Sequence, residues 1–397
     1  MNNMGTQNDQ KGSPQNRGVL SLRAIDVLYC AYLFSVVLMS TIGMGAGDSA
    51  YVVVVVIGAI FALSRIMSIR FSPQFLLLAI ALTCLGVIEF YISRRTTLLL
   101  TALLLVSAKE IQPRLLIGTF LAAKIIGLCL VVALVITGVF GVETYQYFKM
   151  ATGTYIQRVF VNGSSTTIMH LSFLAIIFLS FYMKKGRCGL VYYFGFFFLD
   201  LICANITGSY MGFLLGIGGL ALFWICQHVN KFRGLLVKYS TAVLPLLLLL
   251  TFGTAFMFGH SSAVDAIDRL FQGRVYYNHY FMSNYSVSLF GHGMLSDEGN
   301  FDNSFVFVLV AYGAVTFCVL FGSIQLLIFR LKEQADWVSI ALVVVYLIAA
   351  LSESFYPAAA VNPSLLLLVP LFELVGQGEE KTLTNPHAAH SKSWGRD

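Results

Sequence analysis

The chain has 397 residues, of which 58% are hydrophobic and only 11% are charged. Soluble domains carry about 25% charged residues, so this composition excludes an ordinary soluble protein and predicts one that lies in a membrane. The formal net charge of +6 indicates an orientation bias in the loops, not a surface for nucleic acid. The seven cysteines include no CxxC pair, which argues against disulfides and zinc sites.

Polar segments flank a long apolar region. Residues 1–23 are rich in Asn, Gln, Gly and Ser, and they lack the apolar core and cleavage site of a signal peptide. We therefore expect a disordered cytoplasmic tail over 1–23, a single transmembrane domain over 24–376, and a second disordered cytoplasmic tail over 377–397.

Twelve apolar runs predict membrane-spanning helices, because one span needs about 20 mostly apolar residues. In chain order they cover about 24–45, 50–66, 72–91, 95–108, 114–141, 165–183, 189–206, 209–227, 240–259, 304–329, 336–353 and 358–376. The expected fold class is therefore all-α, a polytopic membrane protein with about 12 transmembrane helices.

The distribution of Lys and Arg predicts the orientation, because cytoplasmic loops carry an excess of both. With the N-terminus inside, 18 of the 25 basic residues fall in inner segments and six in outer segments, while Lys124 lies within a span. Both termini are thus expected to be cytoplasmic. Two outer loops are then expected, at about 142–164 and about 260–304.

The longer outer loop contains two amphipathic segments separated by Gly273. Apolar residues at helical spacing in the first segment and aromatic residues in the second predict helices that lie at the membrane interface. Aromatic rings also stack on sugars, whereas a simple aromatic belt is the alternative for each ring. The candidate sugar-binding rings are Tyr276, Tyr277 and Tyr280.

Outer arginines are candidates for binding phosphate, because the guanidinium fork matches phosphate oxygens. They are Arg94, Arg95, Arg158, Arg269 and Arg274. All of them except Arg274 have a stated structural alternative. Arg269 lies four residues after Asp265 and is able to pair with it, Glu89 is able to compensate the Arg94-Arg95 pair, and Arg158 is able to contact a lipid headgroup.

Three further outer residues, His279, His292 and Asp302, are candidates for a functional role. The alternatives are solvated loop histidines and, for Asp302-Asn303, a cap on the following helix. Gly291 and Gly293 permit a tight turn close to a ligand.

Two charges lie deep in the predicted spans. Lys124 and Asp200 are either functional or paired with each other across helices. The sequence contains no Walker motif, GxGxxG or HExxH, so neither a nucleotide-binding fold nor a zinc protease is indicated.

Four local patterns resemble the Wzy-type bacterial polysaccharide polymerases, which make O-antigen, capsule or exopolysaccharide and are related to the O-antigen ligases. The patterns are Arg95-Thr96-Thr97, the run Arg158–Gly163, the turn Thr207–Gly212, and the series of Gly273-Arg274, Ser288–Gly293, Asp302–Phe305 and Ala311–Gly313. Tyr210 departs from the family, which often has Arg there. Asp302-Asn303 stands where ligases tend to have His-Asn, which favours a polymerase.

The resemblance implies a GT-C-like membrane glycosyltransferase that joins undecaprenyl-diphosphate-linked repeat units at the outer face of the bacterial cytoplasmic membrane, without metal or cofactor. It implies catalytic roles for Arg274, His292, Asp302 and His279, diphosphate binding by Arg158, Arg95, Arg94 and Arg269, and sugar binding by Tyr276, Tyr277, Tyr280 and Asn303. Expected partners are lipid-linked oligosaccharides, membrane lipids, a flippase and chain-length regulators. The alternatives are ligase-like transfer to another acceptor and a lipid-linked oligosaccharide flippase or transporter.

Overall fold

A computed structural model describes residues 24–44, 49–68, 72–93, 95–149, 154–161, 164–292 and 302–372. Its elements are α1 (Ala24–Thr41), α2 (Ser49–Ser68), α3 (Pro73–Ser93), α4 (Thr97–Ser107), α5 (Pro113–Ile136), β1 (Val142–Lys149), β2 (Thr154–Val161), β3 (Ser164–Ser165), α6 (Thr166–Met183), α7 (Leu190–Thr207), α8 (Tyr210–His228), α9 (Asn230–Met257), α10 (Ser262–Leu270), α11 (Arg274–Asn284), α12 (Ser304–Phe307), the π-helix η1 (Val308–Tyr312), α13 (Gly313–Glu333), α14 (Trp337–Ala349) and the 3-10 helix η2 (Pro363–Leu368).

The described residues include seven helices that are long and apolar enough to cross a membrane: α1, α3, α5, α7, α8, α9 and the run Ser304–Glu333. Five shorter apolar helices accompany them, within α2, α4, α6, α14 and the segment Pro363–Phe372. Large apolar side chains such as Leu77, Val191 and Leu249 are exposed on the outside of the bundle, which suits contact with lipid. The expected class, a mainly helical polytopic membrane protein, is confirmed.

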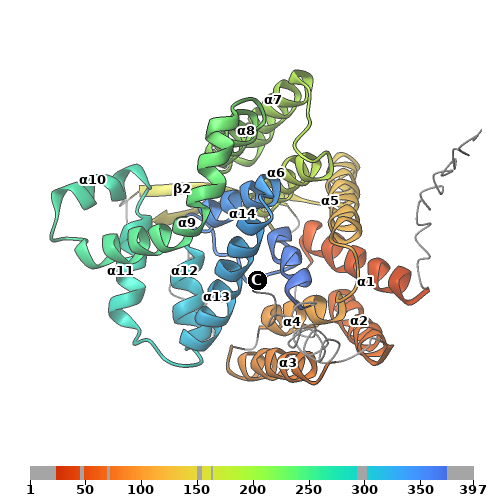
Figure 1. Cartoon of the computed structure of the whole chain (residues 1–397). Coiled ribbons are helices and arrows are strands. Elements are labelled where there is room, and N and C mark those ends of the chain that lie inside the picture. Colours follow the sequence, from red (N-terminus) through yellow and green to blue (C-terminus); the bar gives the residue numbers. More distant parts are fainter. Residues whose placement is uncertain are drawn as a thin grey trace, which may run out of the picture.

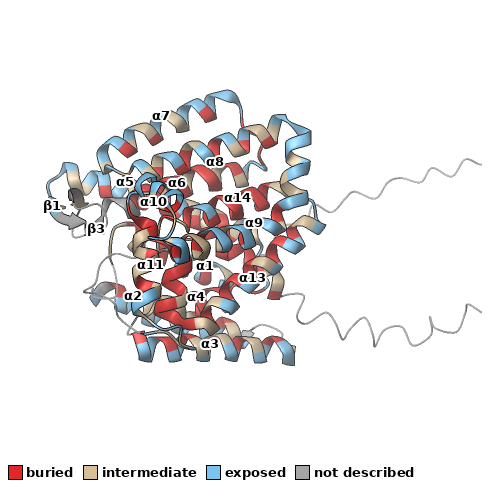
Figure 2. Ribbon diagram, turned by 90° about the vertical axis from the view of Figure 1, so that its left-hand side faces the viewer, coloured by how far each residue is buried: buried red, intermediate tan, exposed pale blue. Residues whose placement is uncertain are grey.

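Helix α14 lies at the centre of the bundle (Figure 1) and contacts α6, α8, α9 and α13. It is apolar on every side and almost fully buried, as a helix enclosed by others must be. Helices α3 and α7 form opposite margins of the molecule, and buried positions concentrate between them (Figure 2). Helices α10 and α11 lie beside α9, and we call this the α11 end of the bundle.

One expected outer loop is not helical. Strands β1 and β2 form an antiparallel hairpin in which Tyr145 lies opposite Arg158, and β3 adds a short third strand. The segment is rich in β-branched and aromatic residues, which favour strands. Within the described residues, this small sheet is the one β structure among the helices.

The end of the described chain also differs from two predicted spans. Helix α14 stops at Ala349, and residues 350–362 form turns that are largely buried. Irregular backbone inside a membrane protein persists only where other groups satisfy its polar atoms. Here Thr101 of α4 donates its hydroxyl to the Pro357 carbonyl (2.8 Å) and accepts from the Ala359 amide (3.0 Å). We call residues 350–362 the buried segment.

Candidate functional site

The helix that follows the long loop is interrupted. Gly313 has φ +85°, so the chain passes from the π-helix η1 into α13 through a conformation that favours glycine. The interruption leaves main-chain amides without partners in the helix, and carbonyl groups of the preceding loop accept them. The amides of Ala314 and Val315 donate to the carbonyls of Ser288 (2.9 Å) and Leu289 (3.1 Å).

Gly291 has a different role from the one expected. A Cβ atom at this position would lie 2.1 Å from the carbonyl oxygen of Ala311. The amide of His292 donates to the Val310 carbonyl at 3.2 Å. The glycine, whose φ is +75°, therefore lets the loop pack directly on the backbone of the broken helix, and Gly293 lies outside the described residues.

Arg274 begins α11 directly after Gly273, whose φ is +83°. Asp268 orients this start, since its Oδ1 accepts the Tyr276 amide at 2.9 Å. The Arg274 side chain is buried and points toward the buried segment. Its Nε donates to the Ser352 carbonyl at 3.3 Å, and its Nη2 lies 3.9 Å from Glu353 Oε1.

Helix α12 binds the same buried segment from its own first residues. Asn303 caps α12, because its Oδ1 accepts the amides of Phe305 (2.9 Å) and Val306 (3.2 Å). Its Nδ2 donates to the Leu351 carbonyl at 3.2 Å. Ser304 donates its hydroxyl to the Glu353 carbonyl. The capping alternative for Asn303 is thus what the structure shows.

Asp302 and Arg95 complete the cluster. Asp302 directly precedes Asn303 and is buried, with 9% of its surface exposed. The guanidinium of Arg95 lies 5.3 Å from the centre of the Phe307 ring, at the other end of the α12 turn. Both arginines are therefore linked to α12. Arg95 contacts it directly at Phe307, whereas Arg274 binds the buried segment that Asn303 also binds.

Glu89, the carboxylate considered as a partner for the arginine pair, has a contact inside the bundle. It is fully buried in α3, and its Oε1 accepts the hydroxyl of Thr316 in α13 at 2.9 Å. Arg94 lies outside the described residues.

The other predicted phosphate-binding arginines are carried by other elements, Arg269 by α10 and Arg158 by β2. Arg269 is exposed on α10, and its Nε donates to the Asp265 carbonyl at 3.4 Å, close to the intrahelical alternative. The main chain of Arg158 lies in β2, and its side chain is outside the described residues.

Both predicted histidines contact main-chain carbonyls. Nδ1 of His279 lies 2.9 Å from the Ala255 carbonyl of α9, and its ring packs against Phe258 at 5.4 Å. Nε2 of His292 contacts the Ser286 carbonyl. A ring nitrogen that faces a carbonyl carries a hydrogen and donates, so these nitrogens act as donors here.

The three predicted sugar-binding tyrosines are half-buried on α11. Tyr276 and Tyr280 stack at 6.4 Å, and Tyr277 contacts Tyr276 edge to face at 5.4 Å. Tyr277 and Tyr280 also pack beside buried Phe281. These rings build the contact between α11 and its neighbours, and their remaining exposed surface faces outward.

Two side chains of the structure were not predicted as candidates from the sequence. Glu353 lies beside Arg274, although it was placed at the end of a predicted span. A carboxylate inside an apolar run was the available signal.

The second group is His170, which is buried in α6, and its Nε2 lies 2.8 Å from Asp200 Oδ1. Lys124 instead donates to Ser172 Oγ at 3.1 Å. The predicted pairing of Lys124 with Asp200 is therefore wrong.

The described residues contain no group of three or more His, Cys, Asp or Glu side chains placed to hold a metal ion. No family model matches the chain, and comparisons with curated proteins and with solved structures find no match either.

Proposed function

We propose that the protein is a glycosyltransferase that polymerises undecaprenyl-diphosphate-linked repeat units into a surface polysaccharide at the outer face of a bacterial cytoplasmic membrane. The observation that carries this function is the pair of Arg274 and Glu353 at one end of a membrane-embedded bundle, with buried Asp302 one residue before the Asn303 that binds the same segment. Transfer of a sugar from a lipid diphosphate needs a cation for the leaving group and a base for the acceptor, and this cluster offers both.

The reaction uses these groups as follows. An acceptor sugar hydroxyl attacks the anomeric carbon that is bonded to the diphosphate. A new carbon–oxygen bond forms, the bond to the diphosphate oxygen breaks, and its electron pair leaves with the diphosphate. The hydroxyl proton passes to a carboxylate, while Arg274 and Arg95 stabilise the charge on the leaving group.

The carboxylates Glu353 and Asp302 are better candidates for the base than the histidines. One ring nitrogen of His279 and one of His292 donate to main-chain carbonyls, and the other nitrogen of each ring remains an acceptor, so the preference rests on the place of the carboxylates near Arg274. Glu353 lies beside Arg274, so one guanidinium both orients the base and borders the site of the leaving group. The hydrogen bonds that hold the buried segment keep this arrangement fixed before substrate binds.

Reconstitution tests the function directly. The purified protein is placed in liposomes with purified lipid-linked repeat units, and the products are separated by size. A polymerase gives a ladder spaced by one repeat unit. Movement of repeat units between leaflets without a ladder supports the flippase alternative. Transfer of preformed glycan to a different acceptor without lengthening supports the ligase alternative. Either result refutes polymerisation.

A further inference from the structure

A polar cavity lies at the end of the bundle opposite the α11 end. It has a volume of about 600 Å³ and is bordered by the start of α5, the end of α6, and the turn between α13 and α14. Its lining includes Arg114, Lys185 and Trp337. Helix ends that meet at one level, with a Trp among them, are typical of a membrane boundary.

The charge in this cavity is mostly positive. Arg114 and Lys185 face it, whereas the acidic residue there, Asp336, is committed to the start of α14. Its Oδ1 accepts the Ser339 amide at 3.2 Å, and its Oδ2 accepts the Ser339 hydroxyl at 2.5 Å. The cavity therefore suits an anionic group and disfavours a cation.

A second cavity of about 320 Å³ adjoins the first. The two share Pro113, Tyr182 and Asp336 in their walls, and Arg330 lines the second one. The second cavity is as polar as the first, and Leu371 is among the apolar residues of its wall.

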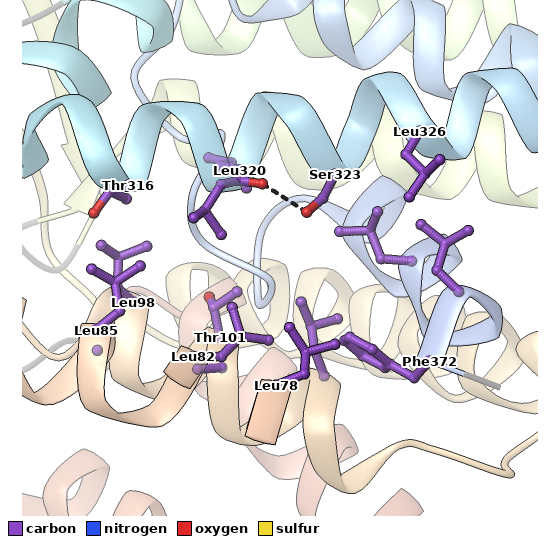
Figure 3. Close-up of a pocket in the computed structure, with 16 residues that line it drawn as sticks. Leu78, Leu82, Leu85, Leu98, Thr101, Thr316, Leu320, Ser323, Leu326 and Phe372 are labelled. Atoms are coloured by element: carbon purple, nitrogen blue, oxygen red, sulfur yellow. Dashed lines mark hydrogen bonds between the residues drawn. The ribbon is translucent and has the colours of Figure 1, made fainter. Parts of the chain in front are cut away.

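Leu371 also lines a third cavity of about 350 Å³, which is a groove between α13 on one side and α3 and α4 on the other (Figure 3). Figure 3 shows Leu326 and Phe372 at one end of the groove, and Thr316 with Leu98 at the other. Thr316 and Leu326 are ten positions apart on α13, which corresponds to about 15 Å of helix rise. Apart from three hydroxyl groups the walls are apolar, with Leu as the commonest residue.

We propose that the three adjoining cavities bind one anionic phospholipid. Its phosphate lies at Arg114 and Lys185, and one acyl chain passes Arg330, which is paired with Glu333 at 3.1 Å, to enter the groove. Leu326, at the near end of the groove, precedes Arg330 by four residues, or about 6 Å of helix rise, so the groove begins close to the second cavity. The site is separate from the Arg274 cluster and independent of the proposed polymerase.

Native mass spectrometry of the detergent-purified full chain tests this site. Phosphatidylglycerol and phosphatidylcholine with identical acyl chains are the probes. We expect one retained phosphatidylglycerol and much weaker retention of phosphatidylcholine. One cationic contact with an anionic headgroup is worth roughly five-fold in affinity, so Arg114→Gln with Lys185→Gln should weaken retention by about 25-fold. Lys231→Gln, an exposed basic residue at the start of α9, is the matched control and should retain lipid normally.

A second pair of variants tests the chain site. Ser323 lies in the groove, and its hydroxyl donates to the Val319 carbonyl of its own helix at 2.6 Å. Ser323→Phe fills the groove and should reduce phosphatidylglycerol retention, whereas Leu249→Phe on the exposed face of α9 should not. Retention of soluble glycerophosphoglycerol as strongly as of the lipid would show a phosphate site without a chain and overturn the proposal.

Three other results also overturn it. The first is equal retention of the two lipids by the wild-type protein, a comparison that needs no variant to fold. The second is equal loss in the Lys231 control. The third is loss in Arg95→Gln with none in the Arg114 and Lys185 variant, because the groove would then be entered from the α11 end.

Discussion

Replacement of Arg274 by Ala separates what this residue does for stability from what it does for transfer. Arg274 makes two hydrogen bonds to main-chain carbonyls, those of Ser352 and Phe271, and both are long at 3.3 Å. A hydrogen bond from a charged group contributes about 1.5–3 kcal/mol, so the low end for two long bonds gives a cost of about 3 kcal/mol in stability. The variant should unfold at a lower temperature and still be purified from the membrane.

If the proposed function holds, the effect on transfer should be larger than this loss of stability explains. Removal of one preorganised donor from a developing negative charge lowers turnover by about 10²–10³-fold. Arg274→Ala in liposomes should therefore leave single repeat units where the wild-type protein makes a ladder. Arg274→Lys keeps the charge without the fork and should recover part of the rate, because one ammonium cannot reach Ser352, Phe271 and Glu353 together.

The assay compares initial rates of ladder formation per folded molecule, at a temperature well below the unfolding midpoint of each variant. Arg274→Ala with a rate within about two-fold of the wild-type rate would remove Arg274 from the transfer step, since donors at a developing charge contribute far more than this. A total rate of ladder formation that falls only in proportion to the folded fraction would also remove Arg274 from the transfer step.

Four further variants test other parts of the structure. Glu353→Gln keeps the shape of the side chain and removes its charge, so we expect normal folding and a loss of about 10²–10⁴-fold in transfer; an unchanged rate would leave Asp302 as the base. Arg269→Ala should change the ladder rate by less than about two-fold, because exposed surface interactions contribute little. Gly291→Ala should cost about 1–3 kcal/mol, read as a lower unfolding temperature. Asp200→Ala should cost about 3–5 kcal/mol by the same measurement, because it strands buried His170.

Much of the helical framework is predictable from apolar runs. The predicted spans 189–206 and 209–227 match α7 and α8 to within one residue at each end. Gly208 between them has φ +66°, and a glycine in this left-handed conformation is a common end to a helix. The start of α9 was less predictable, since Lys231, Arg233 and Lys238 resemble a loop although Lys and Arg form helices well.

The buried segment shows why the rest was not predictable. Apart from Pro357, its composition resembles that of a spanning helix, and only contacts from distant residues decide otherwise. Thr101 and Ser304 bind its main chain from 256 and 49 positions away in the sequence. Local patterns identified Arg274 and Asn303 as candidates, but they contain no information about which carboxylate lies beside that arginine.

The buried segment also affects how the protein matures during synthesis. Chains emerge from the ribosome in sequence order, so Arg95 and Arg274 enter the membrane well before residue 350 is made. Until then, Asn303 and Ser304 lack the carbonyls that they bind in the finished protein. Glu353 is also missing from its place beside Arg274. A nascent chain therefore holds both arginines before the contacts around Arg274 are able to form.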